Sequence, residues 1–227
     1  MCEVAARARA LWGAVAGERF PAEGVRVVVA PGSGLCPPGW VGAVTLGGGT
    51  LVTAPDERVA DVVRRAVAGG PVLARLGDLP HAGVLGPAAL AYVDGDAFAP
   101  VAGGVERLPA AHPDVAALLD AVGPGDAAES AIDEVTSPLF VTRDDSGRVV
   151  AVAGHEAWPA STAHLCVLVH PDVRGRGLAR LVASAAVAHA LAAGLLPQWR
   201  AVPPASRRVA LALGFRELGR QLSVRPG

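Results

Sequence analysis

Two residue types are missing from this 227-residue sequence altogether: its 20 Lys or Arg residues are all arginines, and it contains no asparagine. Without lysine, the chain cannot form a Walker-A phosphate loop, a protein-kinase site or a Schiff base with pyridoxal phosphate. Without asparagine, it has neither an N-glycosylation acceptor nor a Cys-His-Asn catalytic triad. These classes of protein are excluded before any motif is considered.

The sequence also lacks an excess of either positive or negative charge, and it lacks closely spaced pairs of cysteines. The formal net charge is -1, so no long-range field would draw nucleic acid or an anionic membrane to the chain. The cysteines, Cys2, Cys36 and Cys166, are odd in number and widely spaced, with no C-x-x-C pair. This pattern indicates neither a disulfide framework nor a zinc site. We therefore expect no metal, and a reducing compartment, the cytoplasm, as the location.

No hydrophobic run is long enough to suggest a membrane span. The most apolar stretch, residues 181–196, is short, rich in alanine and interrupted by Ser184 and His189, which is typical of a buried helix. The N-terminal region carries Glu3 and Arg7 where an export signal needs an uninterrupted apolar segment. We expect neither nucleic acid nor a membrane among the partners.

Apolar residues are plentiful, at 52% of the chain, so a substantial core can form. Composition shifts around residue 100 and predicts two domains. Residues 1–99 form a small α+β module to which no chemistry can be assigned. Its pattern predicts helices at 2–16 and 55–68, and strands at 25–30, 41–46 and 50–53.

Residues 100–227 have a different pattern, in the order β, α, α, β, β, β, α, β, α, β. It predicts an α/β domain of the α+β type, with a mixed central sheet flanked by helices. The expected strands are 105–108, 139–143, 148–158, 164–169 and 198–202, with a last one after Gly214-Phe215, and the expected helices are 113–122, 126–135, 177–193 and 204–213.

The segment from His164 to Ala179 carries the clearest chemical signal. An almost entirely apolar strand runs into a turn that contains Gly175 and Gly177, and this turn opens the longest helix of the chain. The start of a helix has unpaired backbone N–H groups and about half a positive charge, which together bind phosphate groups. Glycines there remove the Cβ atoms that would keep a diphosphate away. The spacing does not fit a dinucleotide fingerprint, because Arg180 stands where the third glycine belongs.

The sequence Arg174-Gly-Arg-Gly-Leu-Ala179 resembles the R/Q-x-x-G-x-G/A loop of the GNAT superfamily of acyl-CoA-dependent N-acetyltransferases. The preceding Val169-His-Pro, the closing Gly214-Phe215 and the element order from Val105 onward are similar to the same family. This resemblance implies a GNAT-type domain over residues 100–227, with acetyl-CoA as cosubstrate. It implies that the diphosphate lies on backbone amides of Arg174, Gly175, Arg176, Gly177, Leu178 and Ala179.

By the same resemblance, the strands that begin near His164 and Gln198 would separate and admit the pantetheine arm. The arm would pair with the backbone of residues 167–169, that is, Val167, Leu168 and Val169. A backbone N–H of Val167 or Leu168 would then stabilise the oxyanion that forms from the thioester.

The proton-transfer groups depart from the family pattern. Many members carry a tyrosine four residues before the Gly of Gly-Phe, and this chain has Ala210 there. Ser206, one helical turn earlier, is a candidate for relaying a proton through water. The strand position at which some members carry a basic glutamate is Ala163, so Glu156, His164, Glu134 and Glu129 are alternatives for the general base.

The sequence therefore predicts an N-acetyltransferase that moves an acetyl group directly from acetyl-CoA to an amine on a small molecule or peptide. The chain could form a homodimer. The alternative is a non-catalytic acyl-CoA-sensing or partner-binding protein of the same fold. Neither the acceptor nor the role of residues 1–99 follows from the sequence.

Overall fold

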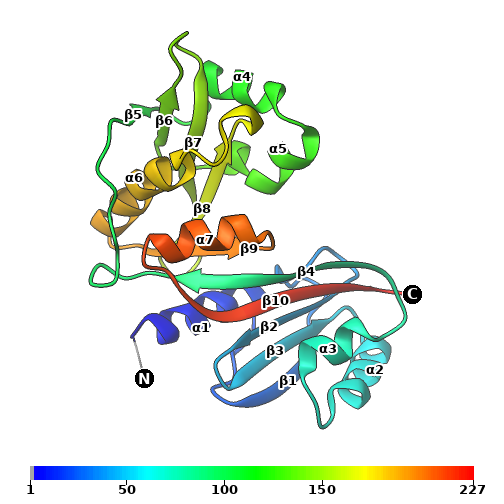
Figure 1. Cartoon of the computed structure of the whole chain (residues 1–227). Coiled ribbons are helices and arrows are strands. Elements are labelled where there is room, and N and C mark those ends of the chain that lie inside the picture. The colour runs from blue at the N-terminus through cyan, green and yellow to red at the C-terminus, as the bar shows by residue number, and fades with distance from the viewer. Residues whose placement is uncertain (1–2) are drawn as a thin grey trace. The chain divides into compact units, whose positions relative to one another are not determined.

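A computed structural model describes residues 3–227 of the chain (Figure 1). Two compact units can be distinguished. Unit 1 comprises residues up to Ala91 together with Arg200–Pro203 and Glu217–Gly227, and unit 2 comprises Tyr92–Trp199 and Pro204–Arg216. Both units are discontinuous in sequence, whereas the division predicted after residue 99 is continuous. Among the described residues, no helix has both the length and the apolar character needed to cross a membrane.

Unit 1 is a mixed sheet with three helices. The strands lie in the order β1-β3-β2-β10-β4, in which β1 and β3 are parallel and β3, β2 and β10 are successively antiparallel. Valines and leucines of α2, α3, β2, β3 and β10 form one apolar core. The elements are α1 (Glu3–Ala16), β1 (Gly24–Val29), β2 (Val41–Leu46), β3 (Gly49–Ala54), α2 (Glu57–Val67), α3 (Val72–Gly77), β4 (His81–Tyr92) and β10 (Arg216–Pro226).

Most of the elements expected for this unit are confirmed. The helix expected at 2–16 is α1, although Cys2 lies outside the described residues. The helix expected at 55–68 is α2, which begins after Asp56 because that side chain accepts a hydrogen bond from the Val59 N–H at 2.8 Å. The strand β4 and the helix α3 were not expected.

Unit 2 is the mixed sheet with flanking helices that the sequence predicts. Its strands lie in the order β9-β8-β7-β6-β5; the neighbours from β5 to β8 are antiparallel, and β8 and β9 are parallel. The elements are β5 (Glu106–Leu108), α4 (Pro113–Ala121), α5 (Pro124–Ser130), the 3-10 turn η1 (Ile132–Glu134), β6 (Leu139–Arg143), β7 (Val149–Trp158), β8 (Thr162–Val169), the 3-10 turn η2 (Pro171–Val173), α6 (Leu178–Ala192), β9 (Leu196–Ala201) and α7 (Pro204–Ala212).

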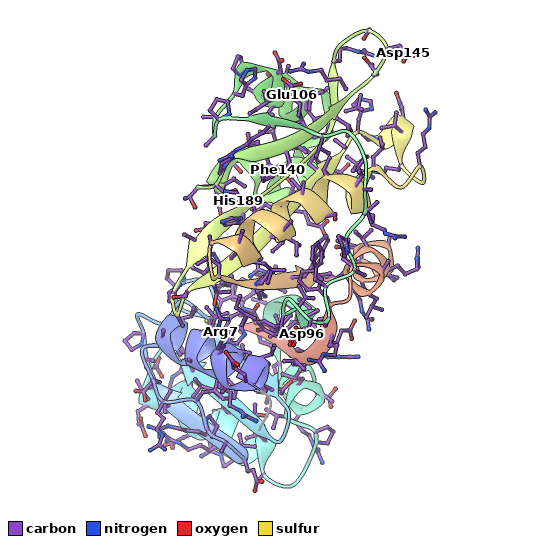
Figure 2. The ribbon with its side chains drawn as sticks, turned by 90° about the vertical axis from the view of Figure 1, so that its left-hand side faces the viewer. Arg7, Asp96, Glu106, Phe140, Asp145 and His189 are labelled. Atoms are coloured by element: carbon purple, nitrogen blue, oxygen red, sulfur yellow. The ribbon has the colours of Figure 1, made fainter. Side chains whose placement is uncertain are left out.

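Helices cover both faces of this sheet (Figure 1). On one face, Cys166 and Leu168 of β8 pack into a core with residues of α4 and η1. Side chains alternate along a strand, so the intervening positions face α6 on the other side. There His155 of β7 lies against His189 of α6, with ring centroids 5.6 Å apart. His189 also packs against Phe140, as Figure 2 shows.

One helix prediction is wrong in part. The acidic helix expected at 126–135 is divided into α5 and η1, because Ala131 between them is left-handed, with φ 48°. This break turns Ile132 and Val135 into the core of unit 2. A continuous helix would direct the side chains of these two residues elsewhere.

Candidate functional site

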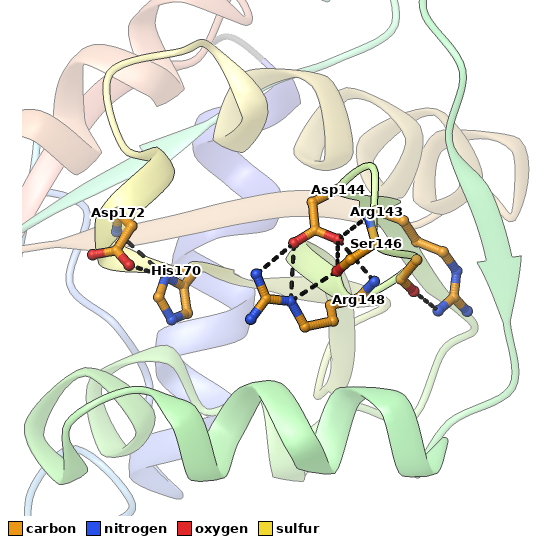
Figure 3. A network of polar contacts seen from close by, with 7 residues as sticks. Arg143, Asp144, Ser146, Arg148, His170 and Asp172 are labelled. Carbon is orange, nitrogen blue, oxygen red and sulfur yellow. Dashed lines mark hydrogen bonds and ion pairs between the residues drawn. The ribbon is translucent and has the colours of Figure 1, made fainter.

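The turn between β8 and α6 is built from local hydrogen bonds and two glycines. His170 caps η2, because its Nδ1 accepts a hydrogen bond from the Asp172 N–H at 3.3 Å (Figure 3). Gly175 and Gly177 follow, with φ values of 79° and 80°. Residues with a Cβ rarely adopt this conformation, and a Cβ on either glycine would meet no other atom. The glycines are therefore needed for backbone conformation and leave the surface of the turn open.

The start of α6 presents unpaired donors to solvent. Gly177 is its N-cap and offers no side chain to bond the helix. The first bond into the cap runs from Leu181 N–H to Gly177 O, at 3.1 Å. The N–H groups of Leu178, Ala179 and Arg180 precede it and have no intrahelical acceptor. This helix start can bind an anion through these amides and the helix dipole.

Three arginines surround the same turn. Arg174 donates from Nη2 to Asp126 Oδ2 at 2.6 Å and from Nε to the carbonyl oxygen of Val169 at 3.3 Å. Arg176 and Arg180 are exposed, and neither makes an ion pair within the described part of the chain. The turn therefore has positive charge that is not neutralised locally.

Strands β8 and β9 run side by side only at their beginnings. Their parallel register has three pairs, from Thr162–Leu196 to His164–Gln198. Strand β8 continues to Val169, and within residues 3–227 no strand pairs with this remaining part on the β9 side. The two strands therefore diverge after His164 and leave an open edge on β8.

The backbone groups that face the open edge follow from the pairing of β8 with β7. The N–H of His170 donates to the Val150 carbonyl at 2.9 Å, and the antiparallel register continues from there without a shift. Bonded and non-bonded pairs alternate in such a ladder. The N–H of Leu168 is therefore directed at β7, whereas the N–H and C=O groups of Val167 and Val169 are directed at the open edge.

Four side chains form a connected polar group where the strands diverge. Nδ1 of His164 lies 2.5 Å from Oε1 of Gln198, and the His164 ring stacks on Trp158, with centroids 4.2 Å apart. The Trp158 indole N–H donates to Oε2 of Glu156 at 2.7 Å, and Glu156 is the register partner of His164 on β7. The structure thus brings together two predicted catalytic residues, Glu156 and His164.

Trp158 and Gln198 complete this group, although the sequence analysis assigned neither to the site. Gln198 is fully buried in a strand whose other inward residues are apolar or aromatic. A buried amide among such residues was the available signal. Its partner could not be identified from the sequence, because His164 lies 34 residues away.

The other two predicted catalytic residues lie on separate elements. Ser206 of α7 accepts a hydrogen bond from the Trp199 indole N–H at 2.9 Å. Glu134 is exposed at the end of η1. Ala210, at the position of the family tyrosine, is buried and has no group that could donate a proton. Within residues 3–227, no three His, Cys, Asp or Glu side chains are grouped so as to hold a metal ion.

Comparison with known proteins finds a family match over part of the chain. Residues 140–220, which run from β6 to β10 and include the turn, match the family model "GNAT acetyltransferase". This part of the chain is similar to GNAT acetyltransferases. A search of curated proteins finds no match.

One solved structure of a GNAT-family protein shares the fold, and two others were also found. A GNAT-family protein from Novosphingobium aromaticivorans is 24% identical, with a TM-score of 0.50 over 64% of this chain and 65% of that one. A GNAT acetyltransferase from Colwellia psychrerythraea is 16% identical, with a TM-score of 0.48 over 63% and 57%. A GCN5-related N-acetyltransferase from Kribbella flavida is 19% identical, with a TM-score of 0.47 over 64% and 60%. The match thus spans less than two thirds of each of these chains.

Proposed function

We propose that the protein is an N-acetyltransferase that transfers an acetyl group from acetyl-CoA directly to an amine. The observation that carries this proposal is the open edge of β8 beside the unpaired amides at the start of α6. One feature accepts a peptide-like arm and the other accepts phosphate groups, as acetyl-CoA requires. Residues 100–227 would hold this activity, and the role of residues 1–99 is unassigned.

The turn would bind the diphosphate. The N–H groups of Leu178, Ala179 and Arg180 donate to its oxygens, and each such bond to a charged acceptor contributes about 1.5–3 kcal/mol. The exposed side chains of Arg176 and Arg180 add charge attraction, typically below about 1 kcal/mol per pair. The amides would therefore dominate affinity and fix the position of the coenzyme.

The open edge of β8 would align the thioester. The amides of the pantetheine arm pair with Val167 and Val169 as a short additional strand, in the manner of strand addition to a sheet edge. The N–H of Val167 then faces the carbonyl oxygen of the thioester and stabilises the negative charge that develops on it. Leu168, the other residue predicted for this contact, directs its N–H at β7.

Proton transfer would be carried by the polar group at the divergence of the strands. The neutral amine attacks the carbonyl carbon, the C–S bond breaks, and the nitrogen loses a proton. His164 is our first choice as the base, with Glu156 beside it. The leaving thiolate has an ordinary pKa near 8.5, so it can depart without the family tyrosine and take a proton from water held by Ser206.

The two free cysteines that the structure describes, Cys36 and Cys166, fit a reducing compartment such as the cytoplasm. The acceptor would be a small-molecule or peptide amine. A homodimer is compatible with the proposal and is not required by it.

A panel of amines incubated with the protein and acetyl-CoA, analysed by mass spectrometry, tests the proposal. We expect at least one amine to gain an acetyl group with release of one equivalent of free CoA. A variant with Gly147→Asp, at a left-handed glycine in the β6–β7 hairpin, is a matched control that should retain activity, whereas Gly177→Asp should lose it.

Ala210 favours a second candidate, a non-catalytic acyl-CoA sensor, because the general acid of many family members is missing there. Binding of acetyl-CoA with no acetylated product from any amine, and no CoA release, would support the sensor and contradict the enzyme.

A further inference from the structure

Gln198 is a fully buried polar side chain to which the proposed chemistry assigns no step of its own. It is the last residue of β9 in register with β8. Its Oε1 contacts His164 Nδ1, and its Nε2 has no hydrogen-bond partner in the described chain. An unsatisfied buried donor is destabilising. A leucine at this position would have no unsatisfied donor. We therefore expect the amide of Gln198 to have a function that an apolar side chain could not perform.

The contact between the two side chains determines where His164 carries its proton. An amide oxygen only accepts hydrogen bonds, so Nδ1 of His164 must donate to Gln198 Oε1. A neutral imidazole has a single N–H. The other ring nitrogen, Nε2, therefore holds the lone pair and is the one that can accept a proton.

The ring is also held in orientation. Trp158 stacks on His164 with an angle of 18° between the ring planes, and Trp158 is itself bonded to Glu156. His164 is only 6% exposed. The imidazole is thus fixed by a stacking contact on its face and by an amide at its Nδ1 edge.

We propose that Gln198 is a positioning residue, which holds neutral His164 as the Nδ1–H tautomer and so makes Nε2 the nitrogen that takes the proton of the acceptor amine. The catalytic part of this inference rests on the proposed N-acetyltransferase function. The tautomer can be measured on the protein without substrate. The tautomer inference and the proposed N-acetyltransferase function can therefore be contradicted independently of each other.

The elements that contact β8 on the face of His164 carry other ionisable groups, which are kept unchanged in the test. They are Glu156 on β7, Cys166 on β8 itself, Asp126 and Glu129 on α5, and Asp133 and Glu134 on η1.

Long-range 1H–15N correlation spectra of the 15N-labelled protein test the tautomer directly. The chain has six histidines, and His164→Gln identifies the signal of His164 by its loss. We expect wild-type His164 at pH 8 to show the Nδ1–H pattern, and Gln198→Leu to shift it towards the Nε2–H pattern. An Nε2–H pattern in the wild type overturns the proposal, and this spectrum needs no variant of Gln198 to fold.

A charge at the same position provides the second readout. In Gln198→Glu, a carboxylate accepts the Nδ1–H bond, and it should raise the pKa of His164 by about 1 unit or more, followed by NMR titration. The matched control is Gln221→Glu, at the only other glutamine of the chain, which is buried in unit 1 and bonded to the Leu35 carbonyl at 2.7 Å. An unchanged His164 titration in Gln198→Glu would overturn the proposal.

Kinetics then separate the tautomer from catalysis. Gln198→Leu should lower kcat by about tenfold or more with little change in the KM for acetyl-CoA, and Gln198→Glu should move the acidic limb of the pH–rate profile to higher pH. An Nδ1–H tautomer without any acetyl transfer contradicts the proposed function alone. Acetyl transfer with kcat unaffected by Gln198→Leu contradicts the positioning role alone.

Discussion

Arg174 and Asp126 form an ion pair of 2.6 Å that joins the glycine-containing turn to the first turn of α5. The same guanidinium donates to the carbonyl of Val169, which is directed at the open edge of β8. Before acetyl-CoA binds, Arg174 therefore occupies an acceptor that the proposed mechanism assigns to the pantetheine arm. Binding has to release this contact.

We expect Asp126→Asn to bind acetyl-CoA about two- to fivefold more tightly, because it frees Arg174 and removes a negative charge close to the diphosphate, a gain of the size typical for an exposed pair. The free energy of unfolding should change by less than about 1 kcal/mol, since both side chains are substantially exposed. Calorimetric titration and urea unfolding measure the two quantities. The matched control is Asp61→Asn, which breaks the exposed pair with Arg64 in unit 1 and should leave affinity unchanged. Weaker binding of acetyl-CoA by Asp126→Asn would contradict this prediction and would show that the ion pair between Arg174 and Asp126 holds the turn in the conformation that binds acetyl-CoA.

Gly177→Asp should abolish acetyl-CoA binding, because it places a carboxylate and a Cβ at the left-handed N-cap of α6, against the diphosphate. Gly147→Asp introduces the same change at a glycine with φ 84° in the β6–β7 hairpin, so it controls for backbone strain of about 1–2 kcal/mol. Isothermal titration calorimetry distinguishes the variants. Equal affinities of the two would count heavily against a diphosphate site at this turn.

Gly214→Ala should destabilise the protein by about 3 kcal/mol or more. Gly214 has φ 90°, and a Cβ there would collide with the carbonyl oxygen of Ala97. Gly194 is also left-handed, at φ 72°, but a Cβ would meet nothing, so Gly194→Ala should cost only about 1 kcal/mol. Urea unfolding at pH 7.5 gives both values. Similar losses in the two variants would mean that the close approach to Ala97 does not contribute.

Stability should fall on acidification between about pH 6.5 and 4. Burial, with repulsion from His189, lowers the pKa of His155 from 6.5 to about 4. In this window His155 is protonated in the unfolded chain but not in the folded chain. The free energy of unfolding therefore rises with pH, by at most about 1.4 kcal/mol per pH unit. The contribution of His155 is complete above pH 6.5. His155→Leu should flatten the dependence, measured by urea unfolding from pH 4 to 8. The control is His81→Gln, at an exposed histidine, which should leave the pH dependence of stability as in the wild type. If His155→Leu has a slope as steep as the wild type, groups other than His155 cause the pH dependence.

Local signals made unit 2 largely predictable. The helix expected at 177–193 is α6 at Leu178–Ala192, because glycines mark its start and an apolar, alanine-rich run fills it. The helix expected at 204–213 is α7. Asp144 stabilises the turn between β6 and β7, because it accepts hydrogen bonds from Ser146 and Arg148 (Figure 3), and these bonds hold its pKa well below the usual range.

Elements that depend on distant contacts were not predictable. Strand β4 contains Gly83 and the Gly86-Pro87 pair, which normally interrupt strands. A Cβ on Gly86 would strike the carbonyl of Gln221, so close packing of two strands far apart in sequence requires this glycine. The C-terminal strand β10 was expected beside the GNAT elements, and the structure includes residues 217–227 in unit 1, in register with β2.

The break in the acidic segment has a similar explanation. Alanine is the best helix former, so Ala131 gave no sign that it would adopt a left-handed conformation. Packing of Ile132 and Val135 into the core outweighs local propensity there. The pairing of His164 with Gln198 likewise depends on strand register, which a single sequence does not encode locally.

A crystal structure of the protein grown with acetyl-CoA tests the central claim most directly. We predict diphosphate oxygens within hydrogen-bond distance of the N–H groups of Leu178, Ala179 and Arg180, and the thioester carbonyl oxygen at the N–H of Val167. Acetyl-CoA bound at any other place, or an edge of β8 that stays closed at saturating acetyl-CoA, would contradict the account.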